Sequence, residues 1–132
     1  MKGRARVHIA VGCGAGIGAL LRYLLTGAVG GSSESDAMVA TLVVNVVGSF
    51  AIAILGELTD RSGRFPLGET ARHFAMAGLC GGFTTFSALS FETYLSLRSG
   101  EILAGTAALV AVIGLSLAAA AVGHLLAIRL NR

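Results

Sequence analysis

The chain has 132 residues, of which 55% are hydrophobic and 13% are charged, and its formal net charge is +3. Soluble domains usually contain about 25% charged residues, so this composition excludes an ordinary soluble protein. The basic residues are spread over several short stretches and form no single patch, so the positive charge does not indicate a nucleic-acid partner.

Four stretches are long and apolar enough to cross a lipid bilayer, which takes about 20 residues of helix. They lie at residues 7–25, 37–58, 74–97 and 102–128, and they leave no room for a separate soluble domain. We therefore predict an all-α membrane protein, with residues 1–132 forming a single four-helix transmembrane domain. The short connections make sequential helices antiparallel neighbours.

Lysine and arginine gather before the first span, around the second connection and after the fourth span. With four spans, these three regions share one side of the membrane. Because basic loops stay on the cytoplasmic side, we expect both termini in the cytoplasm and the protein in the cell (inner) membrane. The basic residues on this side are Lys2, Arg4, Arg6, Arg61, Arg64, Arg72, Arg129 and Arg132, with Arg98 on the other side.

The first span contains one charged residue, Arg22, toward its outer end, and four glycines at alternate positions from Gly12 to Gly18. Small residues let helices approach closely in a membrane, so tight packing is the expected role of most of these glycines. Two interpretations of Arg22 are open. Either its side chain extends to the lipid headgroups, or it caps another helix or sets a positive potential at a pore vestibule.

The second span carries Asn45 at its centre and Thr41 one turn earlier. Polar groups inside a membrane need partners, so they are the first candidates for function. Asn45 either forms an interhelical hydrogen bond that holds the fold or lines a pore as a donor. A threonine hydroxyl can bond to its own helix, so a structural role is expected for Thr41.

The third span contains GGFTTFSALS at residues 81–90, where two glycines and four hydroxyl residues interrupt an apolar helix. Glycines followed by two β-branched threonines are unfavourable inside a helix, so we predict a break near residues 81–85, Gly81 to Thr85. Such a break frees backbone groups that can bind ions. The hydroxyls of Thr85 and Ser87 add uncharged donors, and the ring edge of Phe86 is electropositive, which suits an anion. The alternative is a kinked packing helix whose hydroxyls bond to their own backbone.

Acidic residues are missing from the middle of the first, second and fourth spans. Glu92 lies near the far end of the third span and is expected to be solvated. A small proton-coupled exporter needs a carboxylate within the membrane, so this distribution argues against that class.

Three motifs resemble the Fluc/CrcB family of fluoride channels. In the third span, CGGFTTFSALSFE is similar to the family pattern GFxGGxTTFSTFSxE. In the second span, ATLVVNVVGSF is similar to GTLxxNxxGxF, and in the first, GAGIGALLRY is similar to GAxxRY. The match follows all four spans in order, and the third-span motif is specific.

The resemblance implies a fluoride-selective ion channel, not an enzyme, that exports cytoplasmic fluoride passively and so relieves fluoride toxicity. The channel would be an antiparallel dimer with two pores. Phe86 matches the first pore-lining phenylalanine, and Asn45 matches an asparagine on the fluoride path. Thr85 and Ser87 match hydroxyls beside that path, and Arg22 matches the arginine of the first helix.

The resemblance also implies a structural sodium ion that is not transported. It would be held at the break, between the subunits, by the backbone carbonyls of Gly81 and Thr84 from each subunit. Family members carry a polar track on the fourth helix, for which this chain offers only Thr106 and Ser116. Ser116 is the candidate for the fluoride path.

The chain departs from the family pattern at Leu89, where the family has its second phenylalanine, and at Ala88, where it has a threonine. A leucine on the fluoride path has no electropositive ring edge. Two alternatives to a homodimeric channel are the partner subunit of a heterodimeric fluoride channel and a small proton-coupled multidrug-type exporter. Leu89 favours the first, and so does the uneven charge distribution, because an antiparallel homodimer needs dual topology.

Overall fold

The computed structural model describes residues 2–29 and 34–132, and its regular elements over those ranges are all helical. Four helical stretches are long and apolar enough to cross a membrane: Gly3–Val29, Asp36–Leu58, Glu69–Arg98 and Ile102–Leu130. The prediction of an all-α membrane protein with four transmembrane helices is confirmed. The third helical stretch begins at Glu69, whereas the sequence predicted residue 74.

The first, second and fourth spans are uninterrupted helices, and the third is assembled from several pieces. The uninterrupted helices are α1 (Lys2–Val29), α2 (Glu34–Leu58) and α6 (Ile102–Leu130). The third span consists of α3 (Glu69–His73), the π-helix η1 (Phe74–Cys80), α4 (Gly81–Phe83) and α5 (Phe86–Arg98).

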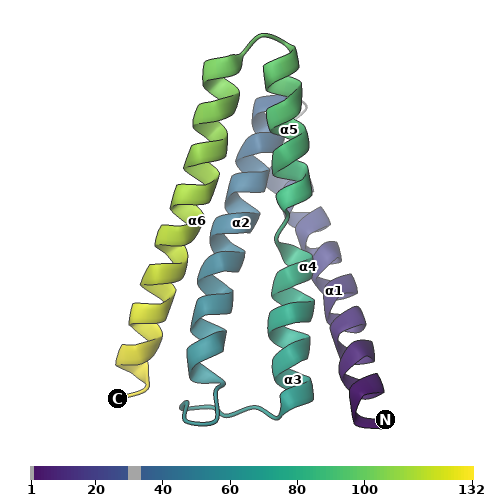
Figure 1. Ribbon diagram of the computed structural model, residues 1–132, viewed down its shortest axis with the longest axis vertical. Helices are drawn as coiled ribbons and strands as arrows, with labels where there is room; N and C mark the ends of the chain where they lie inside the picture. Colours follow the sequence, from purple (N-terminus) through teal and green to yellow (C-terminus); the bar gives the residue numbers. More distant parts are fainter. Residues whose placement is uncertain (1, 30–33) are drawn as a thin grey trace.

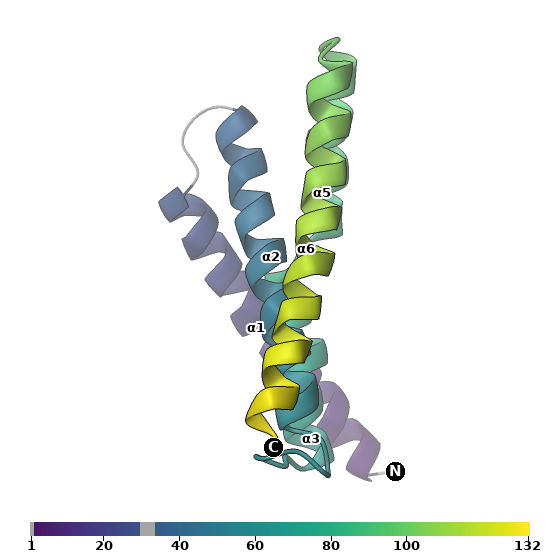
Figure 2. The same ribbon diagram turned by 90° about the vertical axis from the view of Figure 1, so that its left-hand side faces the viewer.

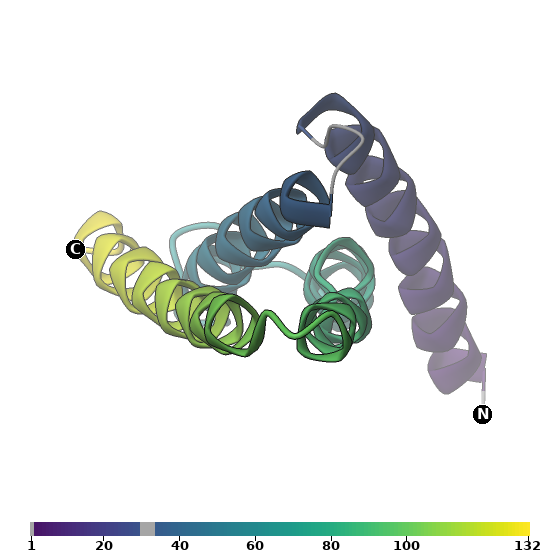
Figure 3. The ribbon, with the colours of Figure 1, turned by 90° about the horizontal axis from the view of Figure 1, so that it is seen from above.

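Both labelled chain ends and the connection from α2 to α3 lie at the same end of the molecule, and the turn from α5 to α6 lies at the other (Figure 1). Helix α2 packs along α6, while α1 packs against η1 and α4. Seen from above, α1 stands on the far side of the third span from α6 (Figure 3). At the end that holds the α5–α6 turn, α1 and α2 lean away from α5 and α6 (Figure 2).

Glycines create the close contact between α1 and the third span. A Cβ added at Gly14 would meet the backbone of Phe74 and Gly78, and one added at Gly18 would meet the backbone of Leu79. The other two glycines of the predicted series, Gly12 and Gly16, have nothing within 4 Å of an added Cβ. Tight packing therefore explains one side of α1 only.

The buried core is small, which is usual where lipid or another chain covers the outer surface. Among the described residues, the only large side chains that are fully buried are Val44 and Leu89. The outer surface is apolar and includes Phe86, Phe91 and Tyr94, all of which are exposed. This surface suits a bilayer and a further protein chain.

Polar contacts fix α6 to the α2–α3 connection at the end of the molecule that carries the termini. The side chain of Asn131 accepts a hydrogen bond from the Arg64 amide at 2.8 Å and donates one to the Glu57 carbonyl at 3.2 Å. His124 Nδ1 lies 2.9 Å from the Glu57 carboxylate. These contacts hold α2 and α6 in register, and both helices line the groove described next.

Candidate functional site

The helix of the third span is interrupted by two extended residues. Helix α4 ends at Phe83, and Thr84 and Thr85 have extended backbone (φ −77°, ψ 159° and φ −149°, ψ 125°) before α5 begins at Phe86. The glycines on which the sequence argument relied, Gly81 and Gly82, are helical instead. Gly82 is needed for packing, because an added Cβ there would meet the backbone of Ala15.

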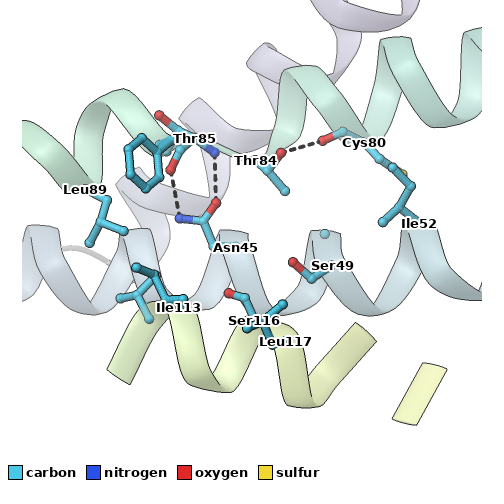
Figure 4. Close-up of a pocket in the computed structure, with 13 residues that line it drawn as sticks. Asn45, Ser49, Ile52, Cys80, Thr84, Thr85, Leu89, Ile113, Ser116 and Leu117 are labelled. Carbon is cyan, nitrogen blue, oxygen red and sulfur yellow. Dashed lines mark hydrogen bonds between the residues drawn. The ribbon is translucent and has the colours of Figure 1, made fainter. Parts of the chain in front are cut away.

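Asn45 of α2 satisfies the backbone of Thr85 with both ends of its amide. Its Nδ2 donates to the Thr85 carbonyl at 2.9 Å, and its Oδ1 accepts from the Thr85 amide at 2.9 Å (Figure 4). Both residues are buried. Of the two interpretations of Asn45, the interhelical hydrogen bond is present. The second hydrogen on Nδ2 has no acceptor among the described residues, so Asn45 can still donate to a ligand.

Arg22 of α1 satisfies the neighbouring carbonyl. Its guanidinium donates from Nη1 to the carbonyl of Thr84 at 3.1 Å. Arg22 therefore caps a helix break, as one of its two sequence interpretations proposed, and does not extend to the headgroups. It also places a positive charge beside the break, where the low dielectric of the membrane strengthens its field.

The first turn of α5 provides unsatisfied donors at the break. Thr85 Oγ1 caps this helix by accepting from the Ala88 amide at 3.1 Å, and it lies 3.2 Å from Ser87 Oγ. The amides of Phe86 and Ser87 have no acceptor among the described residues. A helix N-terminus with free amides carries partial positive charge and favours an anion. The break therefore combines helix polarity with hydroxyl donors.

A groove of about 440 Å³ lies between α2, α5 and α6 beside the break. It brings together five of the six residues predicted for the fluoride path, and Figure 4 shows four of them with labels. The five are Asn45, Thr85, Phe86, Leu89 and Ser116. Ser49 also lines this groove and was missed by the sequence analysis, although it lies one turn after Asn45 on the same face of α2.

A second cavity, the vestibule pocket, has a volume of about 620 Å³ and adjoins the other side of the break. Its wall includes Arg22, Thr41, Ser87 and Glu92, while Thr85 lines both this pocket and the groove. Ser87, the sixth predicted path residue, thus lies on the vestibule side. A hydroxyl row at residues 85 and 87 connects the two cavities.

Two sequence expectations are wrong at the vestibule pocket. Glu92 was expected to be solvated, but it is half-buried, and its Oε2 is buried without a partner among the described residues. Thr41 was expected to bond to its own helix, but its hydroxyl donates to Glu92 Oε1 at 2.7 Å. The carboxylate and the hydroxyl come from different spans, and a sequence alone does not reveal such a meeting.

Phe86 and Leu89 occupy opposite environments although both line the groove. Phe86 is 68% exposed, whereas Leu89 is 1% exposed. The aromatic ring at residue 86 thus lies on the surface of the chain. Leu89 belongs to the core and gives its part of the groove an aliphatic wall.

The carbonyls of Gly81 and Thr84, which the resemblance implies as sodium ligands, differ in their availability. In a continuous helix the Gly81 carbonyl would accept from the Thr85 amide, but that amide donates to Asn45. The Gly81 carbonyl is therefore free of that bond and fits a hard cation. The Thr84 carbonyl already accepts from Arg22, so only its second lone pair can bind a cation, against the charge of the guanidinium.

Comparisons with known proteins agree over nearly the whole chain. Residues 9–124 match the family model described as CrcB-like protein, Camphor Resistance (CrcB). The chain is 43% identical to the fluoride-specific ion channel FluC 3 of Brucella abortus over 127 residues, covering 96% of this chain and 93% of that protein. It is 39% identical to the fluoride-specific ion channel FluC of Methylocella silvestris over 119 residues, which cover 90% of this chain and 91% of that protein. It is also 39% identical to the fluoride-specific ion channel FluC of Opitutus terrae over 125 residues, which cover 95% of each chain.

Proposed function

Because this chain belongs to the CrcB family, we propose that it is a subunit of a fluoride-selective ion channel through which cytoplasmic fluoride leaves the cell passively. The relatives at about 40% identity are named as fluoride-specific ion channels. The protein is accordingly a multi-pass membrane channel and not an enzyme.

The break in the third span is the observation that carries this proposal. Fluoride is a small anion and a strong hydrogen-bond acceptor, so a path for it needs closely spaced donors. The α5 N-terminus and the second amide hydrogen of Asn45 supply such donors, and the hydroxyl pair of Thr85 and Ser87 keeps one free O–H after the hydrogen bond between them. None of these groups carries a full charge, so an ion that enters can also leave.

The proposed efflux path runs from the groove, on the side of the chain termini, past the break and into the vestibule pocket. Arg22 and Thr41 line the vestibule pocket, where the guanidinium raises the local concentration of anions. Between the groove and this pocket, the ion passes the hydroxyls of Thr85 and Ser87. The remaining path residues, all on the groove, are Asn45, Phe86, Leu89 and Ser116.

The complete channel is proposed to be an antiparallel dimer. The exposed ring of Phe86 supports this assembly, because it extends the groove of one chain toward a second chain. A structural sodium ion would be bound at the centre by the carbonyls of Gly81 and Thr84 from each chain, since two carbonyls are too few ligands for one ion. The ion would supply positive charge that holds carbonyls of the two subunits together. The membrane is proposed to be the cell (inner) membrane, with both termini in the cytoplasm.

A specific observation favours a second candidate, the partner subunit of a heterodimeric fluoride channel. Leu89 is a fully buried core residue where the family pattern has a phenylalanine, so one aromatic position is absent from this subunit. The uneven distribution of basic residues also favours one orientation in the membrane. In this case a sister chain of opposite orientation completes the pore.

Fluoride efflux from liposomes that contain only this purified protein tests the proposal. We expect rapid fluoride efflux and chloride efflux at least about 100-fold slower, because chloride is larger and a weaker acceptor for hydroxyl and amide donors. An ion-selective electrode for each anion measures the two rates. Equal rates for the two anions would refute fluoride selectivity, and fluoride efflux only after a sister chain is added would establish the heterodimer.

A further inference from the structure

Two serine hydroxyls in the groove lack the hydrogen bond that other hydroxyls of the spans make. Three other hydroxyl side chains donate to the carbonyl four residues earlier in their own helix: Ser90, Thr93 and Thr106. Ser116 Oγ of α6 is buried and has no partner among the described residues. Ser49 of α2 likewise has no hydrogen-bond partner for its hydroxyl in the part of the chain that the structure describes.

A buried hydroxyl without a partner is costly, so the hydroxyl of Ser116 indicates a ligand or a water molecule at that position, and the half-buried Ser49 adds a free donor on the same groove. Ser49 and Ser116 line the same groove from neighbouring helices, and Figure 4 places both beside Asn45. Ser49 follows Asn45 by four residues, which is one helical turn on the same face. The two serines therefore lie along the groove, away from the vestibule pocket.

The surroundings of the two serines define the chemistry of an occupant. Ile52, Ile113 and Leu117 give the groove apolar walls around the hydroxyls. Two neutral O–H donors in such walls suit a small ion or molecule that accepts hydrogen bonds. Among the residues that line the groove there is no carboxylate, and the two O–H groups can donate, so this position favours a hydrogen-bond acceptor.

We propose that Ser49 and Ser116 together form a second fluoride-binding position, one turn of α2 beyond Asn45 and on the side of the break that faces the chain termini. This inference rests on the proposed fluoride channel and adds Ser49 to its path. Each hydroxyl donates one hydrogen bond to the same ion. On its way out of the cell, the ion moves from this position to the donors of Asn45 and Thr85, so fluoride is passed between two sets of uncharged donors.

The experiment measures fluoride efflux from liposomes for the full chain and for Ser49→Ala, Ser116→Ala and the double variant. We expect each single variant to reduce the rate about tenfold, because each removes one hydrogen bond to a charged group. Because both hydroxyls bind the same ion, the fluoride efflux rate of the double variant should be close to the rates of the single variants. Independent roles would instead multiply to about a 100-fold loss, and that result would overturn a shared site.

Ser49→Thr, which keeps the hydroxyl, should restore most of the flux that Ser49→Ala loses. Thr93→Val is the matched control, because that hydroxyl bonds to Leu89 O at 2.8 Å and Thr93 lines neither cavity. The temperature of thermal unfolding in detergent should not fall in either serine variant, since their hydroxyls bond to no described residue. A loss of stability that parallels the loss of flux would assign the serines to packing and overturn the inference.

The outcomes also separate this inference from the proposed function. A wild-type protein that passes no fluoride, alone or with a sister chain, would refute the channel function and the serine site together. Wild-type flux that Ser49→Ala leaves unchanged would refute only the serine site.

Discussion

At the scale of single residues, Asn45 and Arg22 repair the break by binding backbone atoms. Asn45 pairs with the amide and the carbonyl of Thr85, and Arg22 pairs with the carbonyl of Thr84. An unpaired backbone group inside a membrane costs several kcal/mol, so an open break without these side chains would be unstable. The same contacts hold the donors of the proposed fluoride path in place.

We predict that Asn45→Asp abolishes fluoride efflux and lowers the free energy of unfolding by about 2 kcal/mol. The carboxylate keeps an acceptor for the Thr85 amide but loses the donor to the Thr85 carbonyl, so two acceptors face each other. Its negative charge also repels an anion on the path. Liposome efflux and thermal unfolding in detergent provide the two measurements.

Asn131→Asp is the matched control for this substitution. Asn131 also uses its amide on backbone atoms, of Glu57 and Arg64, but it lies at the end of the molecule and lines neither cavity. This variant should keep its fluoride efflux. Wild-type efflux in Asn45→Asp would show that Asn45 serves packing alone.

At the scale of elements, the contact between α1 and the third span depends on the backbone approach that glycine permits. Gly18 faces the backbone of Leu79 and Phe83, whereas Gly16 faces open space. This contact also positions Arg22, which is one turn beyond Gly18 on the same helix. A change in the packing of α1 would therefore alter the contact between Arg22 and the break.

We predict that Gly18→Ala lowers the free energy of unfolding by about 2 kcal/mol, because the added methyl group meets backbone atoms that cannot move aside. Gly16→Ala, on the same helix, should be neutral or stabilising by up to about 1 kcal/mol, since alanine favours the helix and meets nothing. Unfolding of both variants in one detergent gives the comparison. Equal effects at the two positions would show that α1 packs differently.

The sequence predicted the four spans because length and apolar composition alone determine which segments enter a membrane. It also identified Asn45 and the hydroxyls of the third span, since polar residues are conspicuous in an apolar setting. The pairing of Thr41 with Glu92 was not predictable, because it depends on how two spans are rotated. The π-helix η1 has no sequence signal that we recognise. Ser49 was missed because its surroundings, and not its residue type, distinguish it.

At the scale of the whole molecule, charge is distributed unevenly between the two ends. The chain ends and the α2–α3 connection share one end, which carries most of the basic residues, and the α5–α6 turn at the other end carries Arg98. Basic residues close to the spans set the orientation of insertion, and acidic residues contribute little. The orientation in turn decides whether one chain can supply both halves of an antiparallel dimer.

We predict that the chain inserts mainly in one orientation, with its termini in the cytoplasm. The test uses single cysteines in place of Ser62, in the α2–α3 connection, and Ser99, before the α5–α6 turn. Both positions are exposed, and they mark the two ends of the molecule. In a background without Cys13 and Cys80, each should react with a membrane-impermeant thiol reagent from one face only. Comparable labelling of both sites from both faces would establish dual topology and support a homodimer.

The hydrogen bonds at the break also determine how the two sides of each contact can evolve. Asn45 and Arg22 bind only main-chain atoms of residues 84 and 85, and every amino acid except proline offers the same atoms. Substitutions at the two threonines therefore leave these contacts in place. At Thr85 the choice of residue is limited to helix-capping side chains such as serine, aspartate or asparagine, because Thr85 caps α5. No other side chain reproduces the paired donor and acceptor of asparagine at the same length. These contacts therefore require the asparagine side chain at position 45 but only the main chain at positions 84 and 85.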